Sequence, residues 1–319
     1  SDMASISNPE YRRCPATGRW VVLAPERALR PIQLQHSEPH IRRDAAARGV
    51  CPFCPGNEGE TPPETMAVRP EGGETNGGGW LVRAVPNKFP ALAPDEGVHE
   101  VIVNTPRHVT RLAELTGEEA GRAVAAWAER VAAVARDPRG LRPFLFLNQG
   151  AAAGASLQHS HAQLVGLPFD PPRLVARERA FAAAPACPVC ADIASAGVRL
   201  VAEGEGLVAW CPEVPPLSGT VRIAPARHVP DWESWLEPAA LGRCLRDRMA
   251  EVERAFGESA ANLWLHQRRP GSDGDFHWHV DAVPRLGTLA GLELGAGVIA
   301  ATRSPAEVAA RLREVALPA

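Results

Sequence analysis

The sequence has very little lysine. Lys88 is the only lysine in 319 residues, so arginine carries nearly all of the positive charge. We attribute the excess of Ala, Arg and Pro to genomic base composition and give it no functional weight. The chain also lacks an apolar run of the roughly 18 residues needed to cross a membrane, and no basic stretch followed by an apolar core opens it. A net charge of −3 argues against a surface that coats nucleic acid, although a local basic pocket remains compatible with it. We expect neither a membrane nor a nucleic acid as a partner.

A disulfide framework is also missing. The chain has seven cysteines, an odd number, and four of them form two Cys-x-x-Cys pairs. This pattern fits metal binding in a reducing compartment better than disulfide bonding, so we expect a cytoplasmic protein. With 45% hydrophobic and 22% charged residues, the chain has the composition of an ordinary globular enzyme with room for two domains.

One layout of motifs occurs twice along the chain. Each half contains a Cys-x-x-Cys pair, a single His and then a His-x-His pair. In both halves about fifty residues separate the single His from the His-x-His. This repeat predicts two homologous lobes, 1–170 and 180–319, with the Pro-rich and Ala-rich stretch 169–188 as their connection.

Local patterns predict both strands and helices. Short apolar runs at 20–23, 100–104, 144–147 and 221–224 are typical of strands. A capping box from Thr116 to Glu119 predicts an Ala-rich amphipathic helix that ends near Arg136, and its counterpart is expected at 238–256. Ser304 and Pro305 predict the start of a last helix. Strands and helices together predict an α+β fold class.

The repeated Cys and His residues predict two zinc sites. Zinc prefers four thiolate or imidazole ligands in a tetrahedron, and a Cys-x-x-Cys turn supplies two of them. The first set is Cys51, Cys54, His108 and His159, and the second is Cys187, Cys190, His228 and His277. The alternative is a pair of redox-active or simply buried cysteines. Two pairs in register with matching His residues favour the metal.

The segment His159-x-His161-x-Gln163 predicts the chemistry of the chain. Side chains alternate along a strand, so the three residues share one face. If a metal holds His159, the neutral imidazole of His161 is free to attack phosphorus and form a covalent phosphoramidate. Gln163 could donate to a phosphate oxygen of that intermediate.

Small and polar residues before this segment suit a phosphate group. Asn148, the turn from Gly150 to Gly154, and Ser156 offer amide, backbone N–H and hydroxyl donors. In the alternative interpretation the run is a plain loop and His161 is a core histidine. The combined neighbourhood favours a phosphate site.

The second copy is not expected to be a second active site. His279 stands at the position of His161, but Asp281 replaces the Gln and would repel a phosphate, and His266 replaces the Asn. His279 is then a structural residue, or it competes with His277 as a metal ligand.

These motifs resemble the galactose-1-phosphate uridylyltransferase branch of the histidine-triad superfamily, in which Gln replaces the third His of the triad. The resemblance runs through 11–13, 18–31, 51–57 and 86–92 as well as the active-site segment. It implies a histidine-triad-like α+β fold of two antiparallel half-barrel sheets, each flanked by a helix, which pair between subunits as a homodimer. It also implies a ping-pong transfer of a nucleoside monophosphate from a nucleoside-diphosphate sugar. A sugar 1-phosphate or inorganic phosphate would be the acceptor.

The resemblance also implies roles for individual residues. His161 is the nucleophile, Gln163 stabilises the nucleotidylated His, and Ser156 contacts the phosphates. Four residues fall on the family's nucleotide-binding stretches, where some contacts come from the dimer partner: Arg27, Arg30, Asn87 and Phe89. Arg27 and Arg30 could instead be solvated surface charges. Glu293 falls on the hexose-binding stretch, where Leu292 replaces a frequent Tyr.

Two features are similar to the plant ADP-glucose phosphorylase of this superfamily: Ser160 between the two active-site His residues, and a second metal site of two Cys and two His. Three functions therefore stay open. They are a transferase with a sugar 1-phosphate acceptor, a phosphorylase that cleaves an ADP-sugar or a dinucleoside polyphosphate, and a zinc-stabilised nucleotide-binding protein without catalysis. Hydrolysis is disfavoured because Gln163 replaces the third His.

Overall fold

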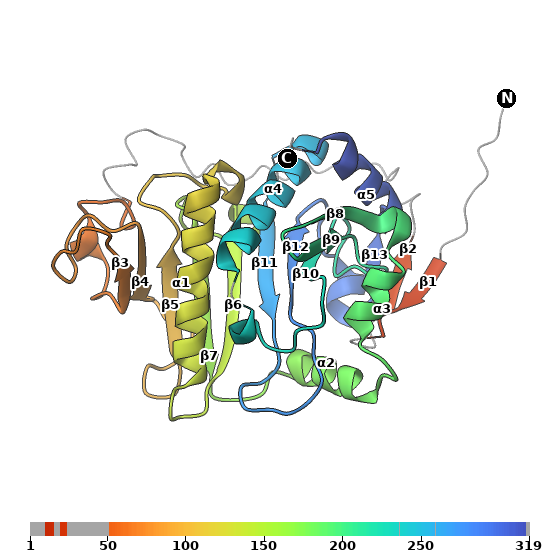
Figure 1. Ribbon diagram of the computed structural model, residues 1–319, viewed down its shortest axis with the longest axis horizontal. Helices are drawn as coiled ribbons and strands as arrows, with labels where there is room; N and C mark the ends of the chain where they lie inside the picture. Colours follow the sequence, from red (N-terminus) through yellow and green to blue (C-terminus); the bar gives the residue numbers. More distant parts are fainter. Residues whose placement is uncertain (1–9, 16–19, 24–50, 236, 259, 317–319) are drawn as a thin grey trace.

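The computed structural model describes residues 10–15, 20–23, 51–235, 237–258 and 260–316 (Figure 1). Arg27 and Arg30 lie outside this part of the chain. A large antiparallel sheet dominates the structure. Its strands in chain order are β3 (Met66–Val68), β4 (Val82–Pro86), β5 (Val98–Val103), β6 (Arg142–Gln149), β7 (His161–Leu167), β8 (Leu200–Gly204), β9 (Leu207–Trp210), β10 (Val221–Pro225), β11 (Ala261–His266) and β12 (His279–Pro284).

The two halves of the repeat form the two ends of this sheet, with their corresponding strands in opposite order. The strand order is β3-β4-β5-β7-β6-β11-β12-β10-β9-β8. The first five strands come from the first half of the chain, and the last five are their counterparts in reverse order. The halves join within one chain, because β6 pairs antiparallel with β11, and Asn148 lies opposite Asn262 in this pairing. The predicted α+β class is confirmed. The pairing of subunits into a homodimer stays a prediction.

Two long helices cover one face of the sheet, one from each half. Helix α1 (Gly117–Ala135) begins at the predicted capping box of Thr116, and α4 (Pro238–Phe256) occupies the predicted range of its counterpart. The helices pack very closely: a Cβ on Gly242 would lie 2.4 Å from the backbone of Ala120. Figure 1 shows both helices on the same side of the sheet. No helix in the described part of the chain is long and apolar enough to cross a membrane.

Shorter elements cover the opposite face of the second half. They include α2 (Pro172–Ala183), α3 (Pro188–Ala194) and a small sheet of β1 (Glu10–Arg13), β2 (Trp20–Leu23) and β13 (Ile299–Ala301). Phe181 of α2, Val189 of α3 and Ile299 of β13 pack in one buried cluster with Trp210 of the large sheet. The stretch predicted as a plain connection therefore contains a helix that packs against the second half. The last helix, α5 (Pro305–Glu314), begins at the predicted cap, Ser304.

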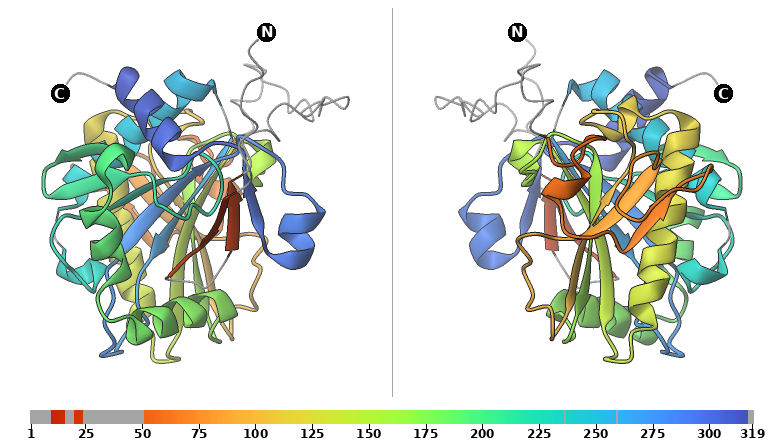
Figure 2. Two further views of the ribbon diagram at one scale, coloured as in Figure 1. Left: turned by 90° about the vertical axis from the view of Figure 1, so that its right-hand side faces the viewer. Right: turned by 90° about the vertical axis from the view of Figure 1, so that its left-hand side faces the viewer.

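Single turns of 3-10 or π helix complete the described elements. They are η3 (Glu58–Glu60), η4 (Leu112–Glu114), η5 (Ala151–Ala153), η6 (Gly197–Arg199), η7 (Trp232–Ser234) and the π-helical turn η8 (Leu292–Ala296). Figure 2 shows η8, in blue, projecting from the body of the molecule.

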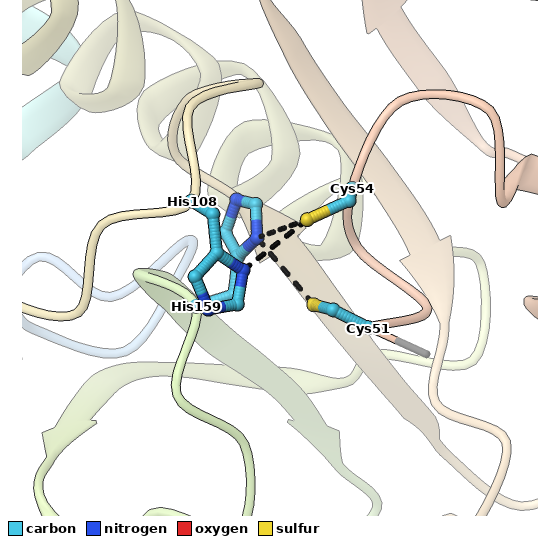
Figure 3. A group of neighbouring side chains, drawn as sticks. All are labelled: Cys51, Cys54, His108 and His159. Atoms are coloured by element: carbon cyan, nitrogen blue, oxygen red, sulfur yellow. Dashed lines mark hydrogen bonds between the residues drawn. The ribbon is translucent and has the colours of Figure 1, made fainter. Parts of the chain in front are cut away.

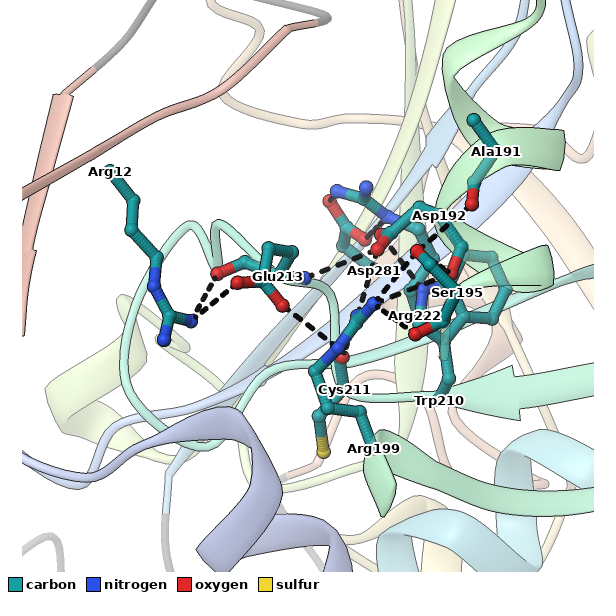
Figure 4. Close-up of polar contacts among 10 residues, drawn as sticks. All are labelled: Arg12, Ala191, Asp192, Ser195, Arg199, Trp210, Cys211, Glu213, Arg222 and Asp281. Carbon is teal, nitrogen blue, oxygen red and sulfur yellow. Dashed lines mark hydrogen bonds and ion pairs between the residues drawn. The ribbon is translucent and has the colours of Figure 1, made fainter. Parts of the chain in front are cut away.

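The N-terminal strands lie with the second half of the chain. Strand β2 pairs in parallel with β13, and Arg12 of β1 forms an ion pair with Glu213 at 2.9 Å. Glu213 also binds Arg199 at 2.9 Å, and Arg199 binds Asp192 of α3 at 2.8 Å (Figure 4). Strands β1 and β2 are therefore attached to the C-terminal half, although the predicted lobe 1–170 includes them.

Candidate active site and metal centres

Four side chains of the first predicted metal set converge (Figure 3). Nδ1 of His108 lies 3.2 Å from Sγ of Cys54, and Nδ1 of His159 lies 3.6 Å from Sγ of Cys51. The four ligand atoms all lie within 4.8 Å of one another, so they could hold one metal ion. Nε2 of His159 lies 2.8 Å from the carbonyl oxygen of Thr105, which can only accept a hydrogen bond. Nε2 therefore carries the proton, and the lone pair of Nδ1 faces the sulfur atoms.

The second set has the same arrangement. Nδ1 of His277 and Nδ1 of His228 lie 3.3 Å and 3.4 Å from Sγ of Cys190, and Cys187 completes the group. Outer partners again hold the imidazoles: Nε2 of His277 lies 3.1 Å from the carbonyl oxygen of Pro225, and Nε2 of His228 lies 2.9 Å from a carboxylate oxygen of Asp275. Between the two possible ligands, the structure places His277 in the group and not His279.

Local backbone structure brings each cysteine pair together. The backbone N–H of Cys54 donates to the carbonyl oxygen of Cys51 at 3.2 Å, which closes a tight turn. Cys187 is the N-cap of α3, and Pro188 at the first helical position favours the start of the helix there. Cys190 follows in the first turn. In both halves one short turn thus presents two sulfur atoms to His residues that are distant in the sequence.

His161 is buried at the start of β7, with its proton fixed on one nitrogen. Nδ1 lies 2.7 Å from the carbonyl oxygen of His159, so Nδ1 must donate and Nε2 keeps its lone pair. Nε2 has no hydrogen-bond partner among the described residues. Burial lowers the pKa of His161 below its ordinary value, which favours the neutral imidazole. This is the tautomer that a nucleophilic Nε2 requires.

A pocket of about 660 Å³ opens beside His161. Of the residues predicted to contact the substrate, five line it: Asn87, Phe89, Ser156, His161 and Gln163. Lys88, the only lysine of the chain, also lines it. The ring of Phe53 packs edge-on against that of His161, with their centroids 5.2 Å apart. The side chain of Phe89 is 82% exposed at the pocket. An aromatic ring and a set of polar groups thus surround a single imidazole.

The predicted phosphate loop lies against the second half of the chain. Nδ2 of Asn262 donates to Oδ1 of Asn148 at 2.8 Å and to the carbonyl oxygen of Ala153 at 2.9 Å. Because Oδ1 of Asn148 accepts this bond, its NH2 group is directed elsewhere. Gly150 and Gly154 have φ angles of 80° and 90°, which glycine adopts readily. A Cβ at Gly150 would also lie 2.9 Å from Cβ of Ala260.

Three predicted contacts are not among the residues that line the pocket: Asn148, Gly154 and Glu293. A Cβ on Gly154 would lie 3.7 Å from Nδ2 of Asn148, so these two residues are close together at the phosphate loop. Glu293 lies on η8, and its carboxylate accepts from the backbone N–H of Ala290 at 2.9 Å and of Ala300 at 3.3 Å. The contacts of Asn148, Gly154 and Glu293 with a substrate stay predictions.

The corresponding place in the second half is closed. Nδ1 of His279 lies 2.9 Å from the carbonyl oxygen of His277, as in the first half, but Nε2 lies 2.6 Å from Nη1 of Arg177. Asp281 is fully buried and accepts two hydrogen bonds from Arg222, at 2.7 Å and 3.0 Å. Burial disfavours its ionisation, yet Arg222 and His266 hold the pKa of Asp281 well below its usual range. His266, His279 and Asp281 are near enough to share a cation, but Arg177 already binds His279 and Arg222 already binds Asp281. Nε1 of Trp264 donates to Nε2 of His266 at 2.7 Å.

Three residues of this arrangement were not singled out from the sequence for these roles. His99 on β5 contacts Gln163, Asn262 holds Asn148, and Arg177 contacts His279. Strand alternation could have indicated His99. It lies two residues before Val101, which lines the pocket, so both side chains are on the same face of β5. Arg177 has no comparable signal, since it lies in the stretch predicted as a connection.

Comparison with known proteins supports the family resemblance. The profile of galactose-1-phosphate uridyl transferase, N-terminal domain, matches residues 83–171. ADP-glucose phosphorylase of Arabidopsis thaliana is 28% identical over 99% of this chain and 95% of its own length. Galactose-1-phosphate uridylyltransferase of Thermotoga maritima is 26% identical over 96% of this chain and 98% of its own. The crystal structure of the Arabidopsis ADP-glucose phosphorylase with bound ADP-glucose has a TM-score of 0.85 at 26% identity, and the match covers 98% of this chain and 100% of that one.

The fold and the comparisons together define the class of protein. The chain has the α+β, histidine-triad-like fold of these relatives and is an enzyme of the nucleotidyltransferase type. Its resemblance to the galactose-1-phosphate uridylyltransferase family, with ADP-glucose phosphorylase among the similar proteins, extends over nearly its whole length.

Proposed function

We propose that the chain moves a nucleoside monophosphate from a nucleoside-diphosphate sugar to a sugar 1-phosphate through a covalent bond to Nε2 of His161. One observation carries the proposal: Nδ1 of His161 donates a hydrogen bond to the carbonyl oxygen of His159, and the imidazole lines a pocket together with Ser156 and Gln163. A neutral imidazole held in this way has its lone pair on Nε2. Nucleophilic catalysis by His requires that lone pair.

The reaction consists of two displacements. Nε2 of His161 attacks the α-phosphorus of the donor, a P–N bond forms, and the bond from phosphorus to the bridging oxygen breaks. The sugar 1-phosphate leaves with that electron pair. A phosphate oxygen of the acceptor then attacks the same phosphorus, and the P–N bond breaks. The amide of Gln163 and the hydroxyl of Ser156 would bind the phosphoryl oxygens, where charge develops.

Each Cys and His cluster is proposed to hold one zinc ion. Two sulfur atoms and two imidazole nitrogens per cluster, with outer hydrogen bonds on the imidazoles, fit tetrahedral zinc. The metal would supply rigidity at the first site. It would fix His159, whose carbonyl oxygen in turn fixes the proton of His161.

A second candidate function is cleavage of an ADP-sugar by inorganic phosphate, and two observations favour it. The structural match to the ADP-glucose phosphorylase has a TM-score of 0.85, compared with 0.73 for a uridylyltransferase. Ser160, the residue shared with that plant enzyme, is buried, and its hydroxyl accepts from Nδ2 of Asn104 at 3.0 Å. A dinucleoside polyphosphate is an alternative donor for this reaction. A purely nucleotide-binding role would not require the lone pair that the fixed proton leaves on Nε2 of His161.

The homodimer also belongs to the proposal. Leu292 and Leu294 on η8, on either side of Glu293, are 45% and 73% exposed. A partner subunit that covered them would bring Glu293 into an interface.

The decisive experiment is intact-protein mass spectrometry after separate incubation with UDP-glucose, UDP-galactose, ADP-glucose and GDP-mannose. The protein should gain the mass of one nucleoside monophosphate from one of these donors and lose it when the correct acceptor is added. Inorganic phosphate and a sugar 1-phosphate other than the one released by the donor, tested separately as acceptors on adduct freed of the first product, distinguish the two candidate functions.

Two variants control this experiment. His161→Asn should give no adduct, whereas His279→Gln, which keeps an acceptor for Arg177, should give the wild-type adduct. Absence of an adduct with every donor, in protein that holds zinc, would contradict the covalent mechanism.

A further inference from the structure

His99 connects two segments of the pocket. It lies on β5, and Gln163 lies on the neighbouring strand β7, with Val101 opposite Gln163 in the pairing. Nε2 of His99 lies 2.9 Å from Oε1 of Gln163. On the other side of the ring, the backbone N–H of Ala91 donates to Nδ1 at 2.9 Å. The imidazole therefore bridges the nucleotide-binding segment that follows β4 and the active-site strand.

These two contacts determine where the proton of His99 lies. A backbone N–H can only donate, so Nδ1 of His99 must be the acceptor and carry a lone pair. In the neutral imidazole the proton is then on Nε2. Nδ2 of Asn87 also lies 3.1 Å from this Nε2, but an amide NH2 cannot accept the proton, so Nε2 donates to Oε1 of Gln163. If the amide of Gln163 were rotated by 180°, only NH2 groups would face this N–H and its proton would have no acceptor. The backbone of Ala91 thus selects the orientation of the Gln163 amide through His99.

That orientation matters for the pocket. Because Oε1 of Gln163 is engaged by His99, the NH2 group points away from that contact, and no described residue accepts a hydrogen bond from it. Gln163 and His161 line the same pocket. Two N–H donors are therefore available beside the imidazole that would carry the nucleotidyl group.

His99 also holds the segment that carries Asn87 and Phe89. The backbone N–H of Asn87 donates to the carbonyl oxygen of His99 at 2.8 Å, and Oδ1 of Asn87 accepts from the N–H of Phe89 at 2.9 Å. With the contact to Ala91, this residue thus positions both ends of a turn on the pocket wall.

We propose that His99 is a positioning residue that directs the NH2 group of Gln163 toward the phosphoryl group on His161. The inference rests on the proposed nucleotidyl transfer. His99 acts through Gln163 and does not itself touch the reacting atoms.

Two conservative variants separate the contacts of His99. A Gln side chain places an amide near the position of Nε2, so His99→Gln keeps a donor for Gln163 and loses the acceptor for Ala91. An Asn side chain reaches only the position of Nδ1, so His99→Asn keeps the acceptor and loses the donor. Zinc content and thermal unfolding would verify that both variants fold.

The measurement is the rate of adduct formation in a single turnover, followed by intact mass with whichever donor labels the wild type. His99→Asn should slow this step by roughly 10- to 100-fold at saturating donor, because a misplaced donor costs less than the roughly 100- to 1000-fold lost when such a donor is removed. His99→Gln should stay within about threefold of the wild-type rate and raise the KM for the donor, because the turn of Asn87 and Phe89 loosens. In a Gln163→Ala background, His99→Asn should have no further effect on the rate.

An adduct that forms as fast in His99→Asn as in the wild type would overturn the inference and leave the proposed function standing. A rate loss that persists in the Gln163→Ala background would do the same. Absence of an adduct in the wild type with every donor would overturn the proposed function and this inference together.

Discussion

Nη1 of Arg177 lies 2.6 Å from Nε2 of His279, whereas the corresponding Nε2 of His161 has no hydrogen-bond partner among the described residues. In both histidines Nδ1 donates a hydrogen bond to the carbonyl oxygen two residues earlier, at 2.7 Å in the first half and 2.9 Å in the second. The same local structure therefore presents a lone pair twice. In the second half a guanidinium group binds that lone pair, so it cannot attack phosphorus.

The buried charges around His279 should matter for stability rather than catalysis. Asp281→Asn removes the carboxylate that pairs with Arg222 and leaves a buried guanidinium without a counter-charge. The free energy of unfolding should fall by about 3–5 kcal/mol. Urea unfolding of the zinc-loaded protein measures this loss. The exposed Asp273→Asn is the matched control and should change stability by no more than about 0.5 kcal/mol. Equal stability of the two variants would show that the Asp281 carboxylate is not a required partner of Arg222.

Removal of one thiolate at a time should separate the two metal sites. The wild type should release two zinc ions per chain on denaturation, and Cys51→Ser and Cys187→Ser should each release one. Only Cys51→Ser should also lose adduct formation, because His159 of that site fixes the proton of His161. Zinc released per chain, measured with a chromogenic chelator, and adduct mass on the same samples provide both readings. Two zinc ions retained by Cys51→Ser would contradict the ligand assignment.

Acid should weaken the buried ion pairs of Glu64 with Arg69 and Arg83. The hydrogen bond from Arg69, together with Arg83, lowers the pKa of Glu64 from 4.5 to about 2. Arg83 in turn donates to Thr61, which lines the pocket. The stabilisation, on the order of 2 kcal/mol, is present above the unfolded pKa of 4.5 and is lost as the pH falls toward 2.

The comparison of wild type with Glu64→Gln measures this term. The wild type should be the more stable protein at pH 7, and the difference in unfolding free energy should shrink steadily from pH 5 downward. A difference that stays constant with pH would show that ionisation of Glu64 is not its source.

The contact between Asn262 and Asn148 should make the first active site depend on the second half. Asn262→Asp replaces the NH2 group by an oxygen facing Oδ1 of Asn148 and the carbonyl oxygen of Ala153. Asn148 would then rotate to donate to the new carboxylate, and its NH2 group would leave the phosphate loop. We expect adduct formation to slow by roughly tenfold, about 1.4 kcal/mol, with zinc content unchanged. Wild-type rates in this variant would exclude a role for Asn148 as a donor.

Features that depend on short stretches of sequence were predictable. The capping boxes at Thr116 and Ser304 begin helices as expected, and the two Cys-x-x-Cys pairs meet the expected His residues. Capping and chelation use ligands at fixed spacing, so one sequence suffices to find them. The zinc ions themselves stay predictions.

Features that depend on long-range geometry were not predictable. The pairing of β6 with β11 joins strands more than a hundred residues apart, and no local pattern fixes its register. The contact of Arg177 with His279 depends on how α2 packs. The role of His99 depends on which ring nitrogen holds the proton, which only the polar partners of the ring reveal.

The pairing of β6 with β11 has a consequence for how such a molecule can change over generations. Two identical subunits joined at this seam would receive every substitution in both copies at once, so an arginine that blocked one histidine would block the other. Here both copies lie in one chain and mutate independently. One copy could keep its nucleophile open to substrate, while the other filled the equivalent place with Arg177. The second copy then holds the first in position, through contacts such as that of Asn262 with Asn148.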